Sequence, residues 1–264
     1  MTLERMKLTI DGPVAILAFN HQEVLNALSP KLLQDFNTAL DAIEDPANGV
    51  RCLVLTGEGR AFCAGANLQG DMGKREGGKI DAGAALETVY HPILRRLRNL
   101  PFPIITAVNG PAAGAGMSFA VMGDLIVAAR SAYFMQAFRR IGLVPDCGST
   151  WLLPRLIGRA RSLELSLLGD RLPAEKALEW GLINRVVDDG EALNEALKLA
   201  TELANGPTVA LGLIRKLYIE STDNSFEEQL DLERQSQRTA GRAQDFAEGV
   251  QAFLEKRPAQ FKGR

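Results

Sequence analysis

The order in which β-rich and helical stretches follow one another constrains the fold most. Short β-rich runs are followed by stretches with apolar residues at helical spacing, and this cycle of strand, strand and helix recurs along the first part of the chain. Such alternation indicates an α/β core. From about Glu191 only helical spacing remains. The sequence therefore predicts a core domain over residues 1–195 and a helical region over residues 196–264.

Several segments show the pattern clearly. Residues 6–20 are expected to form a hairpin that turns at Asp11 and Gly12. Ser29 and Pro30 are typical of an N-cap and a first helical residue. Strands are expected at residues 51–62, 103–110, 124–130 and 182–187, and helices at residues 29–46, 84–100, 114–122 and 172–181.

Composition and charge limit the classes of function. With 46% hydrophobic and 23% charged residues among 264, the chain has the composition of a globular protein with a packed core. Its formal net charge is -2, and acidic and basic residues are interspersed rather than gathered in blocks. Because nucleic acids are bound by concentrated basic faces, we expect no nucleic-acid partner.

The cysteines and histidines argue against a disulfide protein and a metalloprotein. Cys52, Cys63 and Cys147 are odd in number and far apart, with no C-x-x-C pair, and the only histidines are His21 and His91. This usage favours the reducing cytoplasm over secretion. It also predicts neither a zinc site nor another metal site.

One uncharged segment is long enough to be tested as a membrane span. Residues 101–123, "PFPIITAVNGPAAGAGMSFAVMG", carry no charge and hold Gly110 and Gly114 in a G-x-x-x-G spacing. Prolines, glycines and polar residues interrupt the segment, however, and buried strands covered on both faces have similar composition. We therefore expect a buried part of the core, no membrane partner, and no signal peptide in "MTLERMKLTIDG".

Two turns rich in glycine and alanine follow predicted strands. They are "GRAFCAGANL" (59–68) and "NGPAAGAGMS" (109–118), and the second leads into a helix. Small residues let the backbone approach a ligand, and a helix start offers free N–H groups. A dinucleotide fingerprint is excluded because Phe119 stands at its third glycine position, and no P-loop sequence occurs. Together the turns can direct one N–H each at a single oxygen, which is the design of an oxyanion hole.

Three segments carry a family resemblance. They are "FCAGANL", "ITAVNGPAAGAGMSFAVMGDLIVAARSAYF" and "IGLVPDCGSTWLLPRLIGRARSLELSLLGDRLPAEKALEWGLINRVV". With them the chain resembles the enoyl-CoA hydratase/isomerase (crotonase) superfamily over essentially its whole length, and "YHPILRRL" and "PDCGSTWLLPR" are most similar to its isomerases of phenylacetate breakdown. The resemblance implies an α/β, crotonase-like spiral of repeated ββα units, a C-terminal helical trimerisation region, a homotrimer or a hexamer of two trimers, and an acyl-CoA thioester substrate.

The resemblance also implies roles for individual residues. The backbone N–H groups of Ala66 and Ala115 would hold the thioester oxyanion, while Phe253 would lie near the adenine and Lys256 near a phosphate of CoA, in the same or a neighbouring subunit. Residues 69–85 are expected to form a wall of the acyl pocket. The implied substrate-binding residues are Leu25, Ala64, Asn67, Leu68, Gly114, Phe138, Phe253 and Lys256. Since CoA is part of the substrate, no separate cofactor is implied.

Two glutamates that the family's hydratases use are missing. Counted from Asn109 and Asp124, their positions hold Ser118 and Phe138, neither of which accepts a proton as a carboxylate does. Asp146 instead stands where isomerases and a 4-chlorobenzoyl-CoA dehalogenase of the family place an aspartate. An isomerase needs one base, which removes a proton at one carbon and returns it at another. The apolar stretch "LVPDCGSTWLLP" would raise the pKa of the aspartate and suit it to that role.

We therefore expect an isomerase of 1,2-epoxyphenylacetyl-CoA or of an unsaturated acyl-CoA, with Asp146 as general base. Enoyl-CoA hydration and noncatalytic acyl-CoA binding are the alternatives. Asp146 is also suited to cap a helix that begins near Ser149, or to act as a dehalogenase nucleophile, with His91 at the matching position and Phe138 in place of a tryptophan. A hydrolase triad of Ser118, His91 and Asp146 has little support, because no G-x-S-x-G surrounds the serine.

Overall fold

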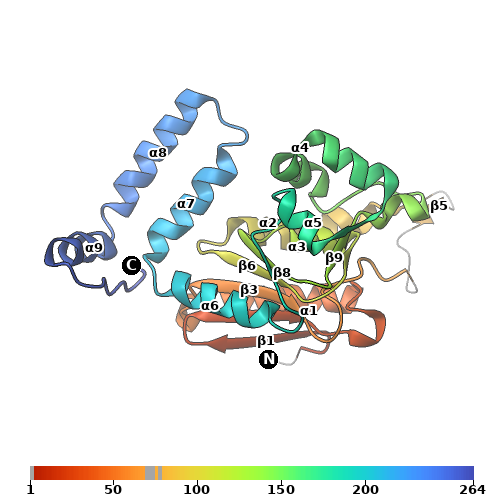
Figure 1. Cartoon of the computed structure of the whole chain (residues 1–264), viewed down its shortest axis with the longest axis horizontal. Coiled ribbons are helices and arrows are strands. Elements are labelled where there is room, and N and C mark those ends of the chain that lie inside the picture. The colour runs from red at the N-terminus through yellow and green to blue at the C-terminus, as the bar shows by residue number, and fades with distance from the viewer. Residues whose placement is uncertain (1–2, 69–74, 77–78) are drawn as a thin grey trace.

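A six-stranded sheet forms the centre of the protein in the computed structural model, which describes residues 3–68, 75–76 and 79–264 (Figure 1). The strands are β1 (Met6–Asp11), β2 (Val14–Phe19), β3 (Cys52–Gly57), β6 (Ile104–Val108), β8 (Leu125–Ala129) and β11 (Arg185–Val187). They lie in the order β1-β2-β3-β6-β8-β11, antiparallel between β1 and β2 and parallel elsewhere. β3 and β6 are buried along their whole length, as parallel strands covered on both faces should be.

The first two strands form the expected hairpin, but its turn is shifted by one residue. Asp11 pairs with Val14, so Gly12 and Pro13 make the turn, and not Asp11 and Gly12. Gly12 has a φ of 54°, which glycine adopts without strain. The carbonyl of Pro13 accepts the N–H of Arg51 at 2.7 Å, which ties the turn to the start of β3.

The chain winds through repeated ββα units, which confirms the implied fold. The small sheet contains β7 (Ala112–Ala113), β9 (Tyr133–Met135) and β10 (Arg171–Pro173), and a separate pair contains β4 (Arg75–Glu76) and β5 (Lys79–Ile80). In the units that begin with β6 and β8, the first strand joins the large sheet and the second joins the small one. Single bridges from Cys63 to Ala112 and from Leu28 to Ala66 continue this arrangement into the earlier units. The second segments of successive units therefore lie side by side.

Six helices of the described chain surround the two sheets in the body of the protein (Figure 1). They are α1 (Pro30–Glu44), α2 (His91–Asn99), α3 (Ala115–Ala120), α4 (Ser149–Leu168), α5 (Ala174–Glu179) and α6 (Ala192–Ala204), with short 3-10 turns η1 (Gln22–Val24), η2 (Pro46–Asn48) and η4 (Ala137–Ile141). α1 packs against β1 and β2, and α6 against β3, β6 and β8. α1 starts as predicted, because Ser29 Oγ accepts the N–H of Leu32 at 3.2 Å and Pro30 is the first helical residue.

Four phenylalanines lie in the core between the units. Phe19 of β2 meets Phe36, Phe62 and Phe119 edge-on, with ring centroids 5.7, 5.3 and 6.1 Å apart. All four side chains are fully buried. Such aromatic pairs contribute about 0.5–1.5 kcal/mol each beyond the burial of their area. They tie α1, α3 and the turn after β3 to one strand.

The helix predicted over residues 84–100 is divided. A π-helical turn, η3 (Leu86–Tyr90), comes first, and α2 follows with Pro92 as its second residue. Proline has no N–H to donate inside an α-helix, but in the first turn that N–H has no intrahelical acceptor. Pro92 therefore marks the beginning of α2 and does not kink a single longer helix.

The helix predicted over residues 172–181 starts later than its spacing suggested. Leu172 and Pro173 belong to β10, in which Leu172 pairs with Phe134. α5 then begins at Ala174. Pairing with a distant strand overrides the local helical pattern here. The predicted stop at Gly181 is confirmed, since this residue follows the helix with a φ of 79°.

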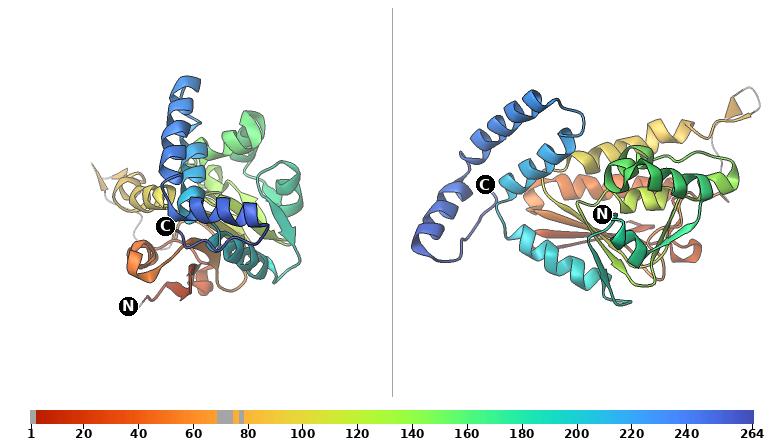
Figure 2. Two further views of the ribbon diagram at one scale, coloured as in Figure 1. Left: turned by 90° about the vertical axis from the view of Figure 1, so that its left-hand side faces the viewer. Right: turned by 45° about the horizontal axis from the view of Figure 1, so that its top comes forward.

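Three further helices form an arm that projects from the body (Figures 1 and 2). They are α7 (Thr208–Glu220), α8 (Phe226–Ala240) and α9 (Gln244–Glu255). At the base of the arm, Arg215 pairs with Asp124 at 2.7 Å. Its guanidinium also donates to carbonyls at the end of α2, those of Leu97, Arg98 and Leu100. The predicted domain boundary at 195/196 falls within α6, and this division stays a prediction.

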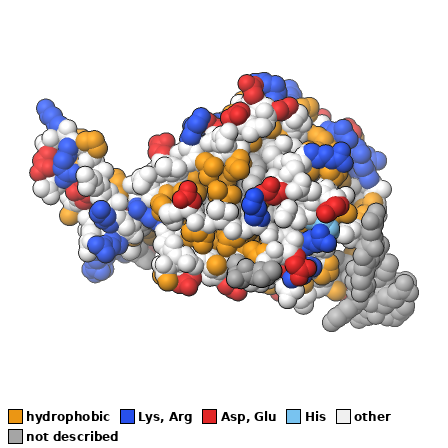
Figure 3. Space-filling view, turned by 90° about the horizontal axis from the view of Figure 1, so that it is seen from below, with side chains coloured by type: hydrophobic (Ala, Val, Ile, Leu, Met, Phe, Trp, Pro, Cys, Tyr) orange, Lys and Arg blue, Asp and Glu red, His pale blue; other side chains and the backbone are white. Residues whose placement is uncertain are grey.

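The surface mixes charges of both signs. On the face seen from below, acidic and basic side chains are interspersed and apolar side chains gather near the middle (Figure 3). Within the described ranges, no helix has the length and apolar character needed to cross a membrane. The uncharged segment 101–123 instead supplies β6, β7 and α3, all of them buried, as expected.

Candidate active site

The two glycine- and alanine-rich turns lie against each other. Cys63 bridges to Ala112, and the N–H of Ala113 donates to the carbonyl of Cys63 at 2.9 Å. A Cβ on Gly65 would lie 2.8 Å from the oxygen of Ala113, and one on Gly116 would lie 2.2 Å from the oxygen of Cys63. Gly65 also has a φ of 96°. The close contact of the turns therefore requires glycine at both positions.

Ala66 and Ala115 each offer a free backbone N–H beside these glycines. Ala115 is the first residue of α3, and its N–H has no acceptor among the described residues. Ala66 forms a β-bridge with Leu28, and the hydrogen bonds of this bridge are made by its neighbours Gly65 and Asn67. The N–H of Ala66 itself therefore points away from Leu28, and it also lacks an acceptor in the described chain. A Cβ on Gly65 would be 3.6 Å from the nitrogen of Ala115. Two neighbouring free donors can bind an oxyanion.

The main chain of Asp146 contacts α3. The hydroxyl of Ser118 in that helix donates to the main-chain oxygen of Asp146 at 3.1 Å. Oδ1 of the carboxylate is buried and has no hydrogen-bond partner within the described structure. Burial raises the pKa of Asp146, and it outweighs a thiol hydrogen bond from Cys147 and the charge of His91, which lower it. The carboxylate is therefore a stronger base than an exposed aspartate.

The interpretation of Asp146 as a helix cap is wrong. The N-cap of α4 is Gly148, and no side chain caps this end. The main-chain oxygen of Asp146, and not its carboxylate, accepts the N–H and the hydroxyl of Ser149 at 3.1 and 2.9 Å. Cys147 and Gly148 then follow with φ of 51° and 79°. A non-glycine residue in this region costs about 1–2 kcal/mol, so the backbone next to the carboxylate is strained.

Tyr90, the last residue of η3, and His91, the first residue of α2, interact electrostatically with Asp146. Tyr90 is buried, and the pKa of its phenol is raised by burial first and then by Cys147 and Asp146. His91 holds Glu87 at 2.9 Å, and its charge lowers the pKa of Asp146. The sequence did not point to Tyr90, because an aromatic residue at helical spacing is typical of a core position.

The loop at residues 24–28 runs beside the first glycine turn. The N–H of Ala64 donates to the carbonyl of Leu25 at 3.0 Å, and that of Asn67 to the carbonyl of Leu28 at 2.9 Å. Leu25 has a φ of 55°, so the loop bends sharply at this contact. The structure thus brings Leu25, Ala64 and Asn67 together, and their role in substrate binding stays a prediction.

Phe138 lies against the second glycine turn. A Cβ on Gly114 would be 3.9 Å from Cζ of Phe138, and the N–H of Gly114 donates to Met135 at 2.9 Å. Phe138 is buried in η4. The cluster therefore has an apolar ring at one implied carboxylate position and the hydroxyl of Ser118 at the other.

Other predicted residues lie apart from this cluster within one chain. Phe253 belongs to α9, and Lys256 follows the last residue of that helix. α9 lies at the far end of the arm (Figures 1 and 2). Phe253 is 82% exposed. Leu68, just after the first glycine turn, is 49% exposed. The predicted pocket wall at 69–85 falls partly outside the described residues.

Ser118 is not arranged as a nucleophile. Its Oγ lies 3.1 Å from the main-chain oxygen of Asp146 and 3.5 Å from that of Gly114, while His91 pairs with Glu87. A serine hydrolase needs the hydroxyl bonded to a base. The triad is therefore absent from the described chain. Among the same residues, no group of three or more His, Cys, Asp and Glu side chains could hold a metal ion.

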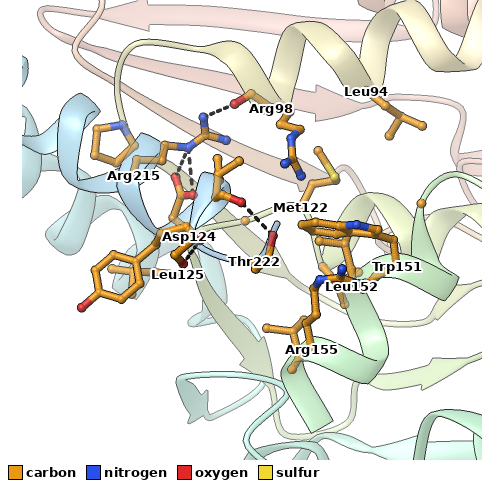
Figure 4. A pocket seen from close by; sticks show the side chains of 18 of the residues that line it. Leu94, Arg98, Met122, Asp124, Leu125, Trp151, Leu152, Arg155, Arg215 and Thr222 are labelled. Atoms are coloured by element: carbon orange, nitrogen blue, oxygen red, sulfur yellow. Dashed lines mark hydrogen bonds and ion pairs between the residues drawn. The ribbon is translucent and has the colours of Figure 1, made fainter. Parts of the chain in front are cut away.

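A cavity of about 910 Å³ opens between α2, α4 and α7 (Figure 4). Cys147 and Gly148 line it, but none of the predicted catalytic residues does. In its wall Trp151 packs between two guanidiniums, with the Cζ atoms of Arg98 and Arg155 at 4.5 and 3.9 Å from the ring centroid. The cavity thus adjoins the Asp146 turn without containing its carboxylate.

Comparisons with known proteins show the family to which the chain belongs. Residues 9–264 match the Enoyl-CoA hydratase/isomerase family. The chain is 48% identical over 255 residues to 1,2-epoxyphenylacetyl-CoA isomerase of Escherichia coli (strain K12), with 97% of each chain covered. It is 41% identical to a "Probable enoyl-CoA hydratase" of Rhodobacter capsulatus, with 100% of each covered. Enoyl-CoA hydratase from Bacillus anthracis has a crystal structure that matches with a TM-score of 0.91 at 31% identity, covering 99% of this chain and 100% of that one.

The fold and the paired turns define an enzyme of the crotonase superfamily. The chain belongs to the enoyl-CoA hydratase/isomerase family, as its sequence motifs predicted. The superfamily carries more than one reaction, since relatives named as isomerase and as hydratase both match along almost the whole chain. The fold therefore does not determine the reaction, which depends on the residues of the site.

Proposed function

We propose that the protein isomerises an acyl-CoA thioester by moving a proton, with Asp146 as general base. The observation that carries this proposal is the carboxylate itself, whose Oδ1 is buried and unpartnered beside α3 in the described structure. Ser118 and Phe138 hold the two positions where the family's hydratases have glutamates. One base suffices for a proton transfer within a molecule, whereas hydration needs a group for the water and a proton source for carbon.

In the proposed reaction, the N–H groups of Ala66 and Ala115 bind the thioester oxygen. Asp146 removes a proton from carbon, and the electron pair of that C–H bond moves onto the oxygen to give a dienolate. The protonated carboxyl then returns the proton at a different carbon, so no atom is gained or lost. An oxyanion-hole donor contributes about 3–4 kcal/mol to such a step. The scheme needs no cofactor, because CoA is part of the substrate.

The substrate we propose is 1,2-epoxyphenylacetyl-CoA or an unsaturated acyl-CoA. The E. coli relative at 48% identity is named for the first of these compounds. The buried ring of Phe138 beside Gly114 gives the site an apolar surface, which suits an aromatic or unsaturated acyl group better than a charged one.

Hydration is the alternative that one observation favours, namely the 41% identity to the R. capsulatus protein named as a hydratase. It would require water to be activated without a second carboxylate at Ser118 or Phe138. A noncatalytic acyl-CoA binder would also keep both turns, but it would not need a carboxylate oxygen that is buried without a partner, as Oδ1 of Asp146 is in the described structure.

Incubation of the purified protein with a panel of acyl-CoAs distinguishes these functions by mass and absorbance. Isomerisation conserves mass, hydration adds one water, haloaryl-CoA cleavage releases halide, and a binder turns over nothing. We expect a product of unchanged mass. Hydration of crotonyl-CoA at a comparable rate would overturn the proposal.

We also propose a homotrimer or a hexamer of two trimers that works in the cytoplasm. Large apolar side chains on the arm are open to solvent in the single chain, among them Tyr218 (77%), Phe253 (82%) and Leu254 (74%). Exposed patches of this kind mark protein–protein contacts. Three free, buried cysteines suit a reducing compartment.

A further inference from the structure

Three hydrogen-bond donors converge on one main-chain oxygen in the site. The carbonyl of Asp146 accepts the N–H of Ser149 at 3.1 Å, its hydroxyl at 2.9 Å, and the hydroxyl of Ser118 at 3.1 Å. Both serines are fully buried. The bonds from Ser149 are local, but the bond from Ser118 spans 28 residues. The hydroxyl of Ser118 has a second, longer contact of 3.5 Å with Gly114 in its own helix.

The bond from Ser118 joins the two parts of the proposed chemistry. Ser118 lies about one helical turn after Ala115, the α3 residue whose N–H is the proposed oxyanion donor. The group that it holds is the main chain of Asp146, the proposed base. The bond therefore fixes the base relative to one oxyanion donor. A displacement of about 1 Å between such groups can slow a reaction roughly 100-fold.

Regular secondary structure does not fix the loop that carries Asp146, and besides the bond from Ser118 it is held by local hydrogen bonds and by the buried Cys147. Between Gly142 and Gly148 the chain forms neither helix nor strand. Leu143 and Val144 are 42% and 77% exposed, and Cys147 has a strained φ of 51°. A strained segment keeps one conformation only where its surroundings determine it. The contact with the rigid, buried α3 is one such determinant.

We propose that Ser118 is a positioning residue, whose hydroxyl keeps the Asp146 loop in register with α3 and keeps the carboxylate in its buried place. The catalytic meaning of this inference rests on the proposed function. The position and burial of the carboxylate can be measured without turnover.

The kinetic test compares Ser118→Ala and Ser118→Cys with the wild type. Ser118→Ala removes the donor, and we expect kcat to fall at least about tenfold with KM little changed, since the base is displaced and CoA contacts are not. Ser118→Cys keeps the size and a weak donor, so it should recover part of the rate. Ser162→Ala is the matched control, because Ser162 is also buried and bonds a carbonyl, that of Gly158 at 2.8 Å, outside the site.

The second test titrates Asp146 by carbon NMR in protein labelled with ¹³C at aspartate carboxyls, with Asp146→Asn to assign the signal. The titratable groups around Asp146 are Cys147 on its own loop, His91 of α2 and Tyr90 of η3. Ser118→Ala should admit water and lower the pKa of Asp146 towards its ordinary value, while Ser162→Ala should leave it unchanged. If Ser118→Ala changes neither kcat nor this titration, the inference is wrong. If the wild type converts no acyl-CoA, the proposed function fails, and the titration alone then decides whether Ser118 positions the Asp146 loop.

Discussion

Arg215 and Asp124 form an ion pair at the joint between the arm and the body. Nε of Arg215 lies 2.8 and 2.7 Å from the two carboxylate oxygens, and the arginine side chain is only 6% exposed. Asp124 also accepts the N–H of Ile104, the first residue of β6, at 2.7 Å. The pair therefore fixes α7 to the central sheet (Figure 4).

Removal of this arginine should destabilise the protein strongly. Arg215→Leu leaves the Asp124 carboxylate without its counter-ion, and carbonyls at the end of α2 lose the guanidinium donor. Breaking a fully buried pair costs about 3–5 kcal/mol, and because the Asp124 side chain is 28% exposed we expect a loss at the lower end of this range. Urea unfolding followed by circular dichroism should show a loss of this size, with the arm as the part most readily cleaved by protease.

An exposed pair in the arm provides the control. Arg234 lies 2.6 Å from Asp231, but the side chains are 66% and 54% exposed. Solvent screens such a pair, so Arg234→Leu should change the free energy of unfolding by less than about 1 kcal/mol. Equal losses in the two variants would contradict the role given to burial.

Gly65→Ala should abolish most activity. The new Cβ would meet the oxygen of Ala113 at 2.8 Å, at a backbone φ of 96° that alanine disfavours. The two turns must then move apart, and the N–H groups of Ala66 and Ala115 no longer converge. Loss of one oxyanion donor reduces kcat about 100- to 1,000-fold, and a loss in this range is expected in steady-state assays.

Gly190→Ala is the control that distinguishes the effect of backbone strain from the effect of the contact between Gly65 and Ala113. Gly190 has a similar φ of 89°, but nothing lies within 4 Å of its added Cβ. This variant should lose about 1–2 kcal/mol of stability and keep its kcat. A comparable loss of kcat in both variants would mean that strain alone, and not contact between the turns, explains the effect.

The apolar end of α9 should control assembly. Phe253→Ser and Leu254→Ser together remove two side chains that are 82% and 74% exposed in the single chain. If they are covered in a trimer, sedimentation velocity should show a shift of the variant towards monomer. Leu167→Ser changes a 65% exposed leucine on the body and should leave the assembly unchanged. A monomeric wild type would remove the proposal.

Local patterns predicted those parts of the fold that depend on neighbouring residues. The cap at Ser29, the proline at Pro30 and the stop at Gly181 each act within one helical turn, so they can be recognised in the sequence. The start of α5 could not be recognised in this way. Leu172 pairs with Phe134, and the spacing of apolar residues along the chain contains no information about a strand partner that is distant in sequence.

In the site, too, features that depend on local sequence could be predicted and features that depend on distant contacts could not. The two turns and the lone carboxylate of Asp146 were evident from glycine content, missing glutamates and family motifs. The hydrogen bond from Ser118 to Asp146 and the position of Tyr90 beside it were not, because both depend on how separate units pack. Serine and tyrosine at helical spacing have many possible partners, and only the fold selects one.

Asp146→Asn should lose most isomerase turnover while CoA binding stays intact. General base catalysis contributes about 100- to 10,000-fold, so a loss of that size is expected. If Asp146 is the base, as we propose, only its ionised carboxylate is active, and burial raises its pKa. The value of kcat/KM should therefore fall as the pH drops through a pKa above the ordinary aspartate value. A pH profile flat down to that ordinary value would contradict Asp146 as the base.

The same raised pKa predicts that Asp146→Asn stabilises the fold at neutral pH. The folded state holds the proton of Asp146 more tightly than the unfolded chain, so stability falls as the pH rises from the unfolded pKa, about 3.9, through the raised folded pKa, and the loss is complete above it. Asparagine has no charge to bury and avoids this loss. Calorimetry at several pH values should give the variant a higher Tm at pH 8 and a difference that shrinks towards pH 4. Other titrating groups cancel because both proteins contain them, so a lower Tm of the variant at pH 8 would show that the buried carboxylate has a stabilising partner.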